Sequence, residues 1–188
     1  MLLRRSDACL KLLLANLRAG RIVVMASDTI YGFVGKAPDT VSQLHRIKAR
    51  KLRKPLLQLI PSVRTLEKLG AILPNSDILN LWPGPFTFIF KLGAGETASF
   101  RVPEDKYTQR LISKLGFNLY STSVNRSGEA PMNDPTEIER VFGNFVSLVE
   151  DSGVFTARRP STVVDVTARL PRILRQGAGI VPDKYLKR

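Results

Sequence analysis

The sequence predicts one α/β domain built on a mixed β-sheet, and three observations point to it. The chain has 188 residues, enough for one compact core and few for two. Its 44% hydrophobic and 24% charged residues are typical of a globular protein. Helical and strand patterns both occur along the chain, but they do not alternate as strictly as a purely parallel sheet requires.

The amino-terminal half begins with a predicted helix. Leucines recur at helical spacing after Ser6, a favoured helix cap, and Gly20 is a typical stop signal. The pattern then predicts a strand at 21–26, a loop at 27–35, a helix at 39–48, a strand at 55–60 and a helix at 62–70.

The carboxy-terminal half contains a predicted hairpin. FTFIFK (86–91) and TASFRV (97–102) have strand composition, and Gly-Ala-Gly stands between them. The other expected elements are helices at 76–82, 105–115 and 135–142 and strands at 117–122, 145–150, 161–166 and 172–176. Residues 183–188 are expected to form a free basic tail.

The charge balance indicates the class of partner. A formal net charge of +13 favours polyanions such as RNA or nucleotides. Asp7 and Lys11 interrupt the apolar start, so a cytoplasmic helix is expected there in place of a signal peptide, and no apolar run is long enough to cross a membrane. One cysteine and one histidine exclude an intrachain disulfide and a zinc site built from these residue types.

The run RIKARKLRKP (46–55) concentrates six cations without an acid. Residues two apart share one side of an extended segment, so Lys48 and Arg50 can face one anion, joined by Lys54. Pro55 favours the end of a helix before it. A solvated helix end is the alternative, since cations suit a helix carboxyl terminus. The run alone favours that alternative.

Two polar segments each follow a predicted strand. STSVNRSG (121–128) places Ser123 and Asn125 two residues apart, where neutral donors can meet phosphate or carboxylate oxygens. SDTIYG (27–32) offers Thr29 for a small polar ligand and Tyr31 for an apolar wall. The alternative for both segments is an ordinary turn or cap.

Two arginines stand within predicted strands. They are Arg101 in FRVP and Arg175 in ILRQGAG, and Ser161 in RPSTVVD is grouped with them. The planar fork of an arginine suits a ligand carboxylate or phosphate. The alternative is an ion pair with Asp165 or Glu104. The chain contains no P-loop, GxGxxG or HExxH motif.

Taken in order, seven segments make the pattern specific: SDTIYGF, RIKARKLRKPL, WPGPFTFIF, FRVPED, STSVNRSGEAP, PSTVVDV and ILRQGAG. From about Gly20 to Gly179 the chain resembles the Sua5/YrdC/YciO family. The resemblance implies a single YrdC-like domain over 1–188, with a twisted mixed β-sheet, flanking helices and a large basic concave cavity.

The resemblance also implies an activity. Members of the family act as L-threonylcarbamoyladenylate synthases, which make threonylcarbamoyl-AMP and pyrophosphate from L-threonine, bicarbonate and ATP with Mg²⁺. A downstream tRNA threonylcarbamoyl transferase system then modifies N6 of adenosine 37 in tRNA. The basic surface is expected to contact tRNA or double-stranded RNA. The alternative is an RNA- or ribosome-binding YciO-like protein with little or no synthase activity.

Roles follow position by position from the resemblance. The catalytic set that it implies is Lys48, Arg50, Ser123 and Asn125. The ATP-binding set is Lys48, Arg50, Lys54, Asn125, Asn133 and Arg175. The threonine-binding set is Thr29, Tyr31, Arg101, Ser123 and Ser161. No metal ligand and no general base is assigned, and Arg46, Lys51 and Arg53 are expected outside the site, on solvent or RNA.

The chain departs from the family pattern at Ser27, where threonine is more common, in the segment FVGKAPD, and at two positions that bear on the site. Ala49 stands where glycine is common, and a positive φ there would strain alanine by roughly 1 kcal/mol. Leu59 stands where many members carry a histidine near the threonine, which removes one polar contact. Both departures bear on activity and substrate preference.

Overall fold

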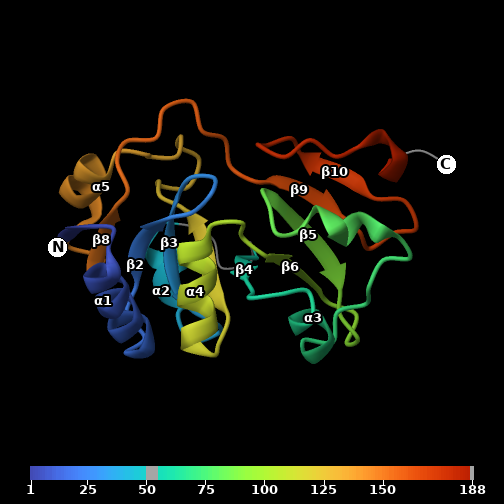
Figure 1. Cartoon of the computed structure of the whole chain (residues 1–188), viewed down its shortest axis with the longest axis horizontal. Helices are drawn as coiled ribbons and strands as arrows, with labels where there is room; N and C mark the ends of the chain where they lie inside the picture. The colour runs from blue at the N-terminus through green and yellow to red at the C-terminus, as the bar shows by residue number, and fades with distance from the viewer. Residues whose placement is uncertain (50–54, 187–188) are drawn as a thin grey trace.

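A ten-stranded mixed sheet runs through the whole molecule (Figure 1). The computed structural model describes residues 1–49 and 55–186. The strand order is β1-β8-β2-β3-β7-β4-β6-β5-β9-β10. The strands are β1 Leu2–Arg4, β2 Val23–Ala26, β3 Tyr31–Lys36, β4 Leu57–Leu59, β5 Phe86–Lys91, β6 Thr97–Arg101, β7 Leu119–Ser123, β8 Leu148–Asp151, β9 Thr162–Asp165 and β10 Arg172–Arg175. Parallel pairs such as β5 with β9 and antiparallel pairs such as β2 with β3 both occur, which confirms the predicted mixed sheet.

Apart from the 3-10 helix at Asp183–Tyr185, the helices lie in the places that the sequence predicts. They are α1 Asp7–Arg18, α2 Val41–Ile47, α3 Thr65–Lys68, α4 Lys106–Leu115 and α5 Pro135–Phe142, with 3-10 helices η1 Asp77–Leu81 and η2 Asp183–Tyr185. The Ser6 hydroxyl caps α1 by accepting the Cys9 N–H at 3.1 Å. The Asp105 carboxylate caps α4 by accepting the Thr108 N–H at 2.9 Å. None of the helices in the described part of the chain is long and apolar enough to span a membrane.

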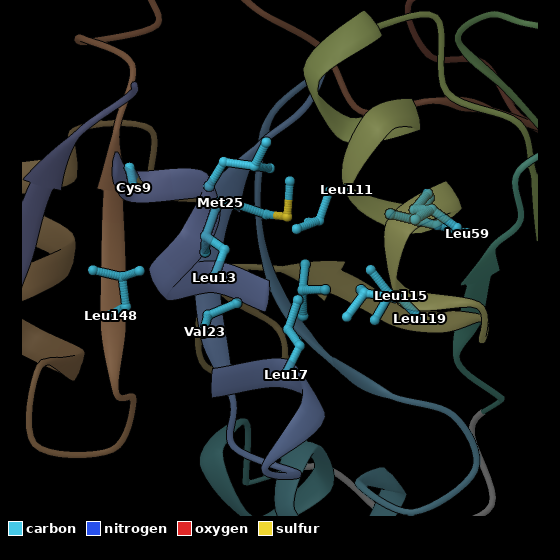
Figure 2. Close-up of a cluster of buried hydrophobic side chains, with 13 residues drawn as sticks. Cys9, Leu13, Leu17, Val23, Met25, Leu59, Leu111, Leu115, Leu119 and Leu148 are labelled. Atoms are coloured by element: carbon cyan, nitrogen blue, oxygen red, sulfur yellow. The ribbon is translucent and has the colours of Figure 1, made fainter. Parts of the chain in front are cut away.

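Separate hydrophobic clusters pack on different parts of the sheet. Helices α1 and α4 lie side by side and bury leucines against β2 and β7 (Figure 2). A second cluster joins α2 and α5 to β3 through Leu44, Phe142 and Phe33. The third packs Trp82 against Phe88 and Phe90 at the other end of the sheet. Each half of the sheet therefore has its own apolar support.

The expected loop at 27–35 is wrong in its second half, because Tyr31–Lys36 forms β3. Glycines at 32 and 35 lower strand propensity, but β3 pairs with β2 on one side and β7 on the other. A Cβ at Gly32 would lie 3.0 Å from the Ser121 hydroxyl, so the glycine permits this close pairing.

Residues 2–4 and 183–186 are more ordered than the sequence predicts. No strand is expected before α1, yet β1 pairs in parallel with β8. The free tail predicted from residue 183 is wrong for residues 183–186, since η2 packs there and Tyr185 is only 7% exposed. Tyr185 packs with the third hydrophobic cluster, which outweighs the polarity of its neighbours.

Candidate active site

A cavity of about 430 Å³ lies over the middle of the sheet. Its walls come from the β2–β3 loop, the end of α2, the end of β7 and the strands of the other half. Most of the predicted site residues line it, namely Thr29, Tyr31, Lys48, Arg101, Ser123, Asn125, Ser161 and Arg175. Arg50 and Lys54 lie outside the described residues. The sheet thus brings together segments that are more than a hundred residues apart in the sequence.

Lys48 is buried at the end of α2 and is 3% exposed. Its ammonium donates to the Asn125 Oδ1 at 2.6 Å, the Ser123 carbonyl at 2.6 Å and the Asn125 carbonyl at 3.1 Å. A buried ammonium requires such partners. The solvated helix end, which the run alone favours, is therefore wrong for Lys48. Its ammonium holds the Ser123–Asn125 turn in place.

The Asn125 amide is the centre of this turn. Its oxygen accepts from Lys48 and from the Ser123 hydroxyl, each at 2.6 Å. Its nitrogen donates to the carbonyls of Arg126 at 2.9 Å and Glu129 at 2.7 Å. Both amide N–H groups and the oxygen are used, so Asn125 shapes the turn through its own hydrogen bonds. The ordinary turn weighed for this segment is present, and it lines the cavity.

Arg101 is buried in β6 and is one of the residues that line the cavity. Its Nε donates to the Gly84 carbonyl at 3.0 Å, one terminal nitrogen donates to the Thr29 hydroxyl at 2.8 Å, and the other donates to the Asp28 carboxylate. These bonds use three of its five N–H groups. Burial lowers the pKa of Arg101, and the Asp28 charge opposes this effect. The remaining N–H groups suit the two oxygens of a carboxylate.

Asp28 is the partner of Arg101, so the ion pair weighed with Asp165 or Glu104 is wrong. Sequence reasoning missed Asp28 as a site residue, although it stands next to Thr29 in the motif SDTIYG. Its Oδ1 is buried and has no hydrogen-bond partner among residues 1–49 and 55–186. The Arg101–Asp28 pair places one cation and one anion beside the cavity. Thr29, which follows Asp28 in the chain, accepts a hydrogen bond from the same arginine.

Arg175 meets Ser161 across the β9–β10 hairpin. Its Nε and a terminal N–H donate to the Ser161 carbonyl at 3.2 and 2.8 Å. The Ser161 hydroxyl lies 2.7 Å from that of Thr87 on β5. Burial lowers the pKa of Arg175. Gly177 allows this approach, because a Cβ there would lie 2.1 Å from the Pro160 carbonyl.

Tyr31 lines the cavity, and Asn133 holds its backbone from outside the lining. The Tyr31 hydroxyl donates to the Gly153 carbonyl at 2.9 Å and accepts the Ser152 N–H at 2.8 Å. Burial raises its pKa to about 12. Ser152 and Gly153 begin the segment that crosses from β8 to β9 (Figure 1). Asn133 is not among the described residues that line the cavity, and its Oδ1 accepts the Tyr31 N–H at 3.2 Å.

Leu59 contributes to an apolar wall of the cavity. It is buried with Leu111 and Leu115 beside α4 (Figure 2). Ile89 and Val163 line the same cavity from β5 and β9. The described lining residues include three cations and no carboxylate. The cavity therefore offers fixed positive charge together with an apolar surface.

Further polar residues line the cavity without having been assigned to the site from the sequence, and Ser121 and Ser99 are two of them. Ser121 and Ser99 stand opposite each other across Leu57 of β4, to which both strands pair. Alternation along β7 gave a signal for Ser121, since it shares a face with Ser123. Among the described residues, no three histidine, cysteine, aspartate or glutamate side chains are grouped to hold a metal ion.

Comparison with known proteins places the chain in a family. Residues 15–177 match the Sua5_yciO_yrdC family model, which is described as "Telomere recombination". The threonylcarbamoyl-AMP synthase of Thiobacillus denitrificans is 31% identical over 167 residues, which are 81% of this chain and 88% of that protein.

Two solved structures share the fold at 23% identity. E. coli YciO superposes with a TM-score of 0.86 over 99% of both chains. P. abyssi Sua5 complexed with L-threonine superposes with a TM-score of 0.84 over 94% of this chain and 57% of that one. From the family model and the sequence identity, the chain belongs to the Sua5/YciO/YrdC family.

Proposed function

We propose that this protein is an L-threonylcarbamoyladenylate synthase. It joins L-threonine, bicarbonate and ATP into threonylcarbamoyl-AMP and releases pyrophosphate, which is a nucleotidyl transfer. The observation that carries the proposal is the meeting of the Arg101 guanidinium with the Lys48-held turn in one cavity. The threonylcarbamoyl-AMP synthases among its relatives support the same activity.

Threonine occupies the part of the cavity beside β6 in this proposal. Its carboxylate takes the remaining N–H groups of Arg101, a favourable charge-assisted pairing. Thr29 and Ser161 offer hydroxyls, while Leu59 and Ile89 face the methyl group. Arg101 is already held by Thr29 and Asp28, so little side-chain entropy is lost on binding.

The triphosphate of ATP occupies the side formed by the Ser123–Asn125 turn and Arg175. Arg50 and Lys54, which follow Lys48 in the chain, supply further positive charge. Mg²⁺ enters with ATP as its phosphate-bound ion, which suits a site where the described residues show no carboxylate cluster. The buried ammonium of Lys48 keeps the turn rigid against these charges.

The chemistry needs positioned charge more than a reactive side chain. The amine of threonine forms an N–C bond to carbon dioxide or bicarbonate, with loss of a proton or of water, to give a carbamate. A carbamate oxygen then attacks the α-phosphorus of ATP, and pyrophosphate leaves. Both reactants are anionic, so fixed cations stabilise the transition state and hold the reacting atoms in line.

The product, threonylcarbamoyl-AMP, is then used to modify tRNA. A separate transferase system moves the threonylcarbamoyl group to N6 of adenosine 37 in tRNA, and the basic chain contacts tRNA or double-stranded RNA. The net charge of +13 supports such a contact, because phosphate neutralisation dominates nucleic-acid affinity.

Pyrophosphate release tests the synthase. We expect release from ATP only when threonine and bicarbonate are both present, and loss of release in Arg101→Lys and Arg50→Ala. Two results would contradict the proposal. The first is pyrophosphate release in the absence of threonine or of bicarbonate. The second is no release from folded protein under any combination of substrates. The second result would favour the RNA-binding alternative.

A further inference from the structure

A second hollow of about 500 Å³ lies apart from the cavity. It forms where the α1–β2 turn, the end of α2 and the α5–β8 turn meet, and it shares no described lining residue with the cavity. We call it the Phe145 groove. Its polar and aromatic lining consists of Arg21, Gln43, Arg46, Asn144, Phe145 and Ser147. Arg46 is one of the cations that the active site leaves without a role.

The groove is held by contacts between its walls. The Ser147 N–H donates to the Ile22 carbonyl at 2.9 Å, which ties the α5–β8 turn to the α1–β2 turn. Arg126 donates to the carbonyl of Ile47 at 3.5 Å. Its guanidinium lies 5.8 Å from the centre of the Phe145 ring. The groove is therefore a formed feature of the packing between α2 and the α5–β8 turn.

The exposed phenyl ring is the unusual part of this surface. Phe145 is 53% exposed, although apolar rings are normally buried. Two arginines line the groove with it, a third lies against its ring, and the described lining residues include no carboxylate. Gln43 and Asn144 add amides that can donate and accept hydrogen bonds.

This combination matches an unpaired nucleotide. An aromatic ring stacks on any base, arginines take the flanking phosphates, and amides reach the base edges. An acidic protein segment would use the arginines but leave the ring and amides unused. A base paired within a duplex has its faces covered by its neighbours, so it cannot stack on Phe145. The charge of the whole chain favours the same polyanion.

We propose that the Phe145 groove binds one unpaired nucleotide of RNA, with its base on Phe145 and its flanking phosphates at Arg21 and Arg46. Arg126 follows Asn125 directly, so an RNA strand in the groove lies behind the turn that lines the cavity. That tRNA is the source of the strand rests on the proposed function. The stacking site itself does not.

Fluorescence anisotropy with labelled single-stranded RNA and with a matched RNA duplex tests the groove in the full chain. We expect Phe145→Leu to weaken single-strand binding about five-fold or more, and Phe145→Trp to retain it. The plot of log affinity against log salt has a negative slope. Arg21→Gln and Arg46→Gln should each make this slope shallower by about 0.7, because each removes one phosphate contact. Arg172→Gln removes an exposed arginine from β10, far along the sheet, and is the matched control.

The outcomes separate the groove from the synthase. Pyrophosphate release without RNA should stay unchanged in the Phe145 and Arg46 variants. Single-strand binding that is unaffected by Phe145→Leu, or reduced as much by Arg172→Gln as by Arg46→Gln, would overturn the groove and leave the synthase standing. Loss of RNA binding in the Phe145→Leu variant, with no pyrophosphate release from the wild type, would overturn the synthase alone.

Discussion

The ammonium of Lys48 lies 2.6 Å from the Asn125 Oδ1, and both groups are buried beside the cavity. The lysine-x-arginine and serine-x-asparagine motifs are thus joined by a direct hydrogen bond. This contact makes Lys48 a positioning residue for the turn that the nucleotide would meet. The Lys48 ammonium donates its hydrogen bonds to oxygens of the protein itself, on Ser123 and Asn125.

We expect Lys48→Met to lower stability as well as activity. The methionine leaves the Asn125 Oδ1 and the Ser123 carbonyl short of a buried donor, at a cost of about 1–3 kcal/mol. Urea unfolding measures the loss. A cycle with Asn125→Ala should show a coupling of about 0.5–3 kcal/mol, and additive effects of the two changes would contradict the contact.

Asp28→Asn should weaken threonine binding although Asp28 is not among the described residues that line the cavity. The change leaves the buried Arg101 charge without its anion, at a cost of roughly 3 kcal/mol in stability. Arg101 then loses its fixed orientation, so the KM for threonine should rise more than the KM for ATP. Equal changes in both constants would argue against a role through Arg101. Asp165→Asn, which touches a different arginine, is the control.

Ala49→Gly should leave the protein about 1 kcal/mol more stable than Ala130→Gly does, because both changes add unfolded-state entropy and only the first relieves strain. Alanine adopts φ +49° here, a left-handed conformation that glycine reaches without its Cβ clash. The sequence left the φ of this position open, and the structure shows that it is positive. Thermal unfolding provides the measurement. Ala130→Gly is the control, because the positive-φ residues do not include Ala130 and glycine there adds only unfolded-state entropy. A melting temperature for Ala49→Gly no higher than that for Ala130→Gly would contradict the strain.

Tyr31→Phe should change how stability depends on alkaline pH. Burial raises the pKa of Tyr31 to about 12, above its ordinary value of 10. The neutral phenol therefore stabilises the fold fully below about pH 10, and this contribution of roughly 2 kcal/mol is lost between about pH 10 and 12. The phenylalanine variant lacks this loss. The stability gap between wild type and variant should close over that range, and a gap that stays constant would contradict the shifted pKa.

Several parts of the fold follow from local sequence signals. The cap at Ser6 and the spaced leucines specify α1, because a helix needs only its own hydrogen bonds and one apolar face. The alternating residues at 86–91 and 97–102 specify the β5–β6 hairpin through neighbouring segments. Thr29, Lys48, Arg101 and other lining residues were also identifiable, because their motifs occur in a specific order along the chain.

Other features exist only because distant segments meet. The strand at Tyr31–Lys36 contains two glycines and reads as a loop, yet β2 and β7 satisfy its backbone on both sides. Lys48 reads as a solvated cation until oxygens 75 and 77 residues later reach its ammonium. Asp28 becomes the partner of Arg101 across 73 residues. Local sequence signals determined where helices and hairpins begin. The burial of a charge and the choice of its partner depend instead on which segments the sheet places side by side, and tertiary packing alone decides this placement.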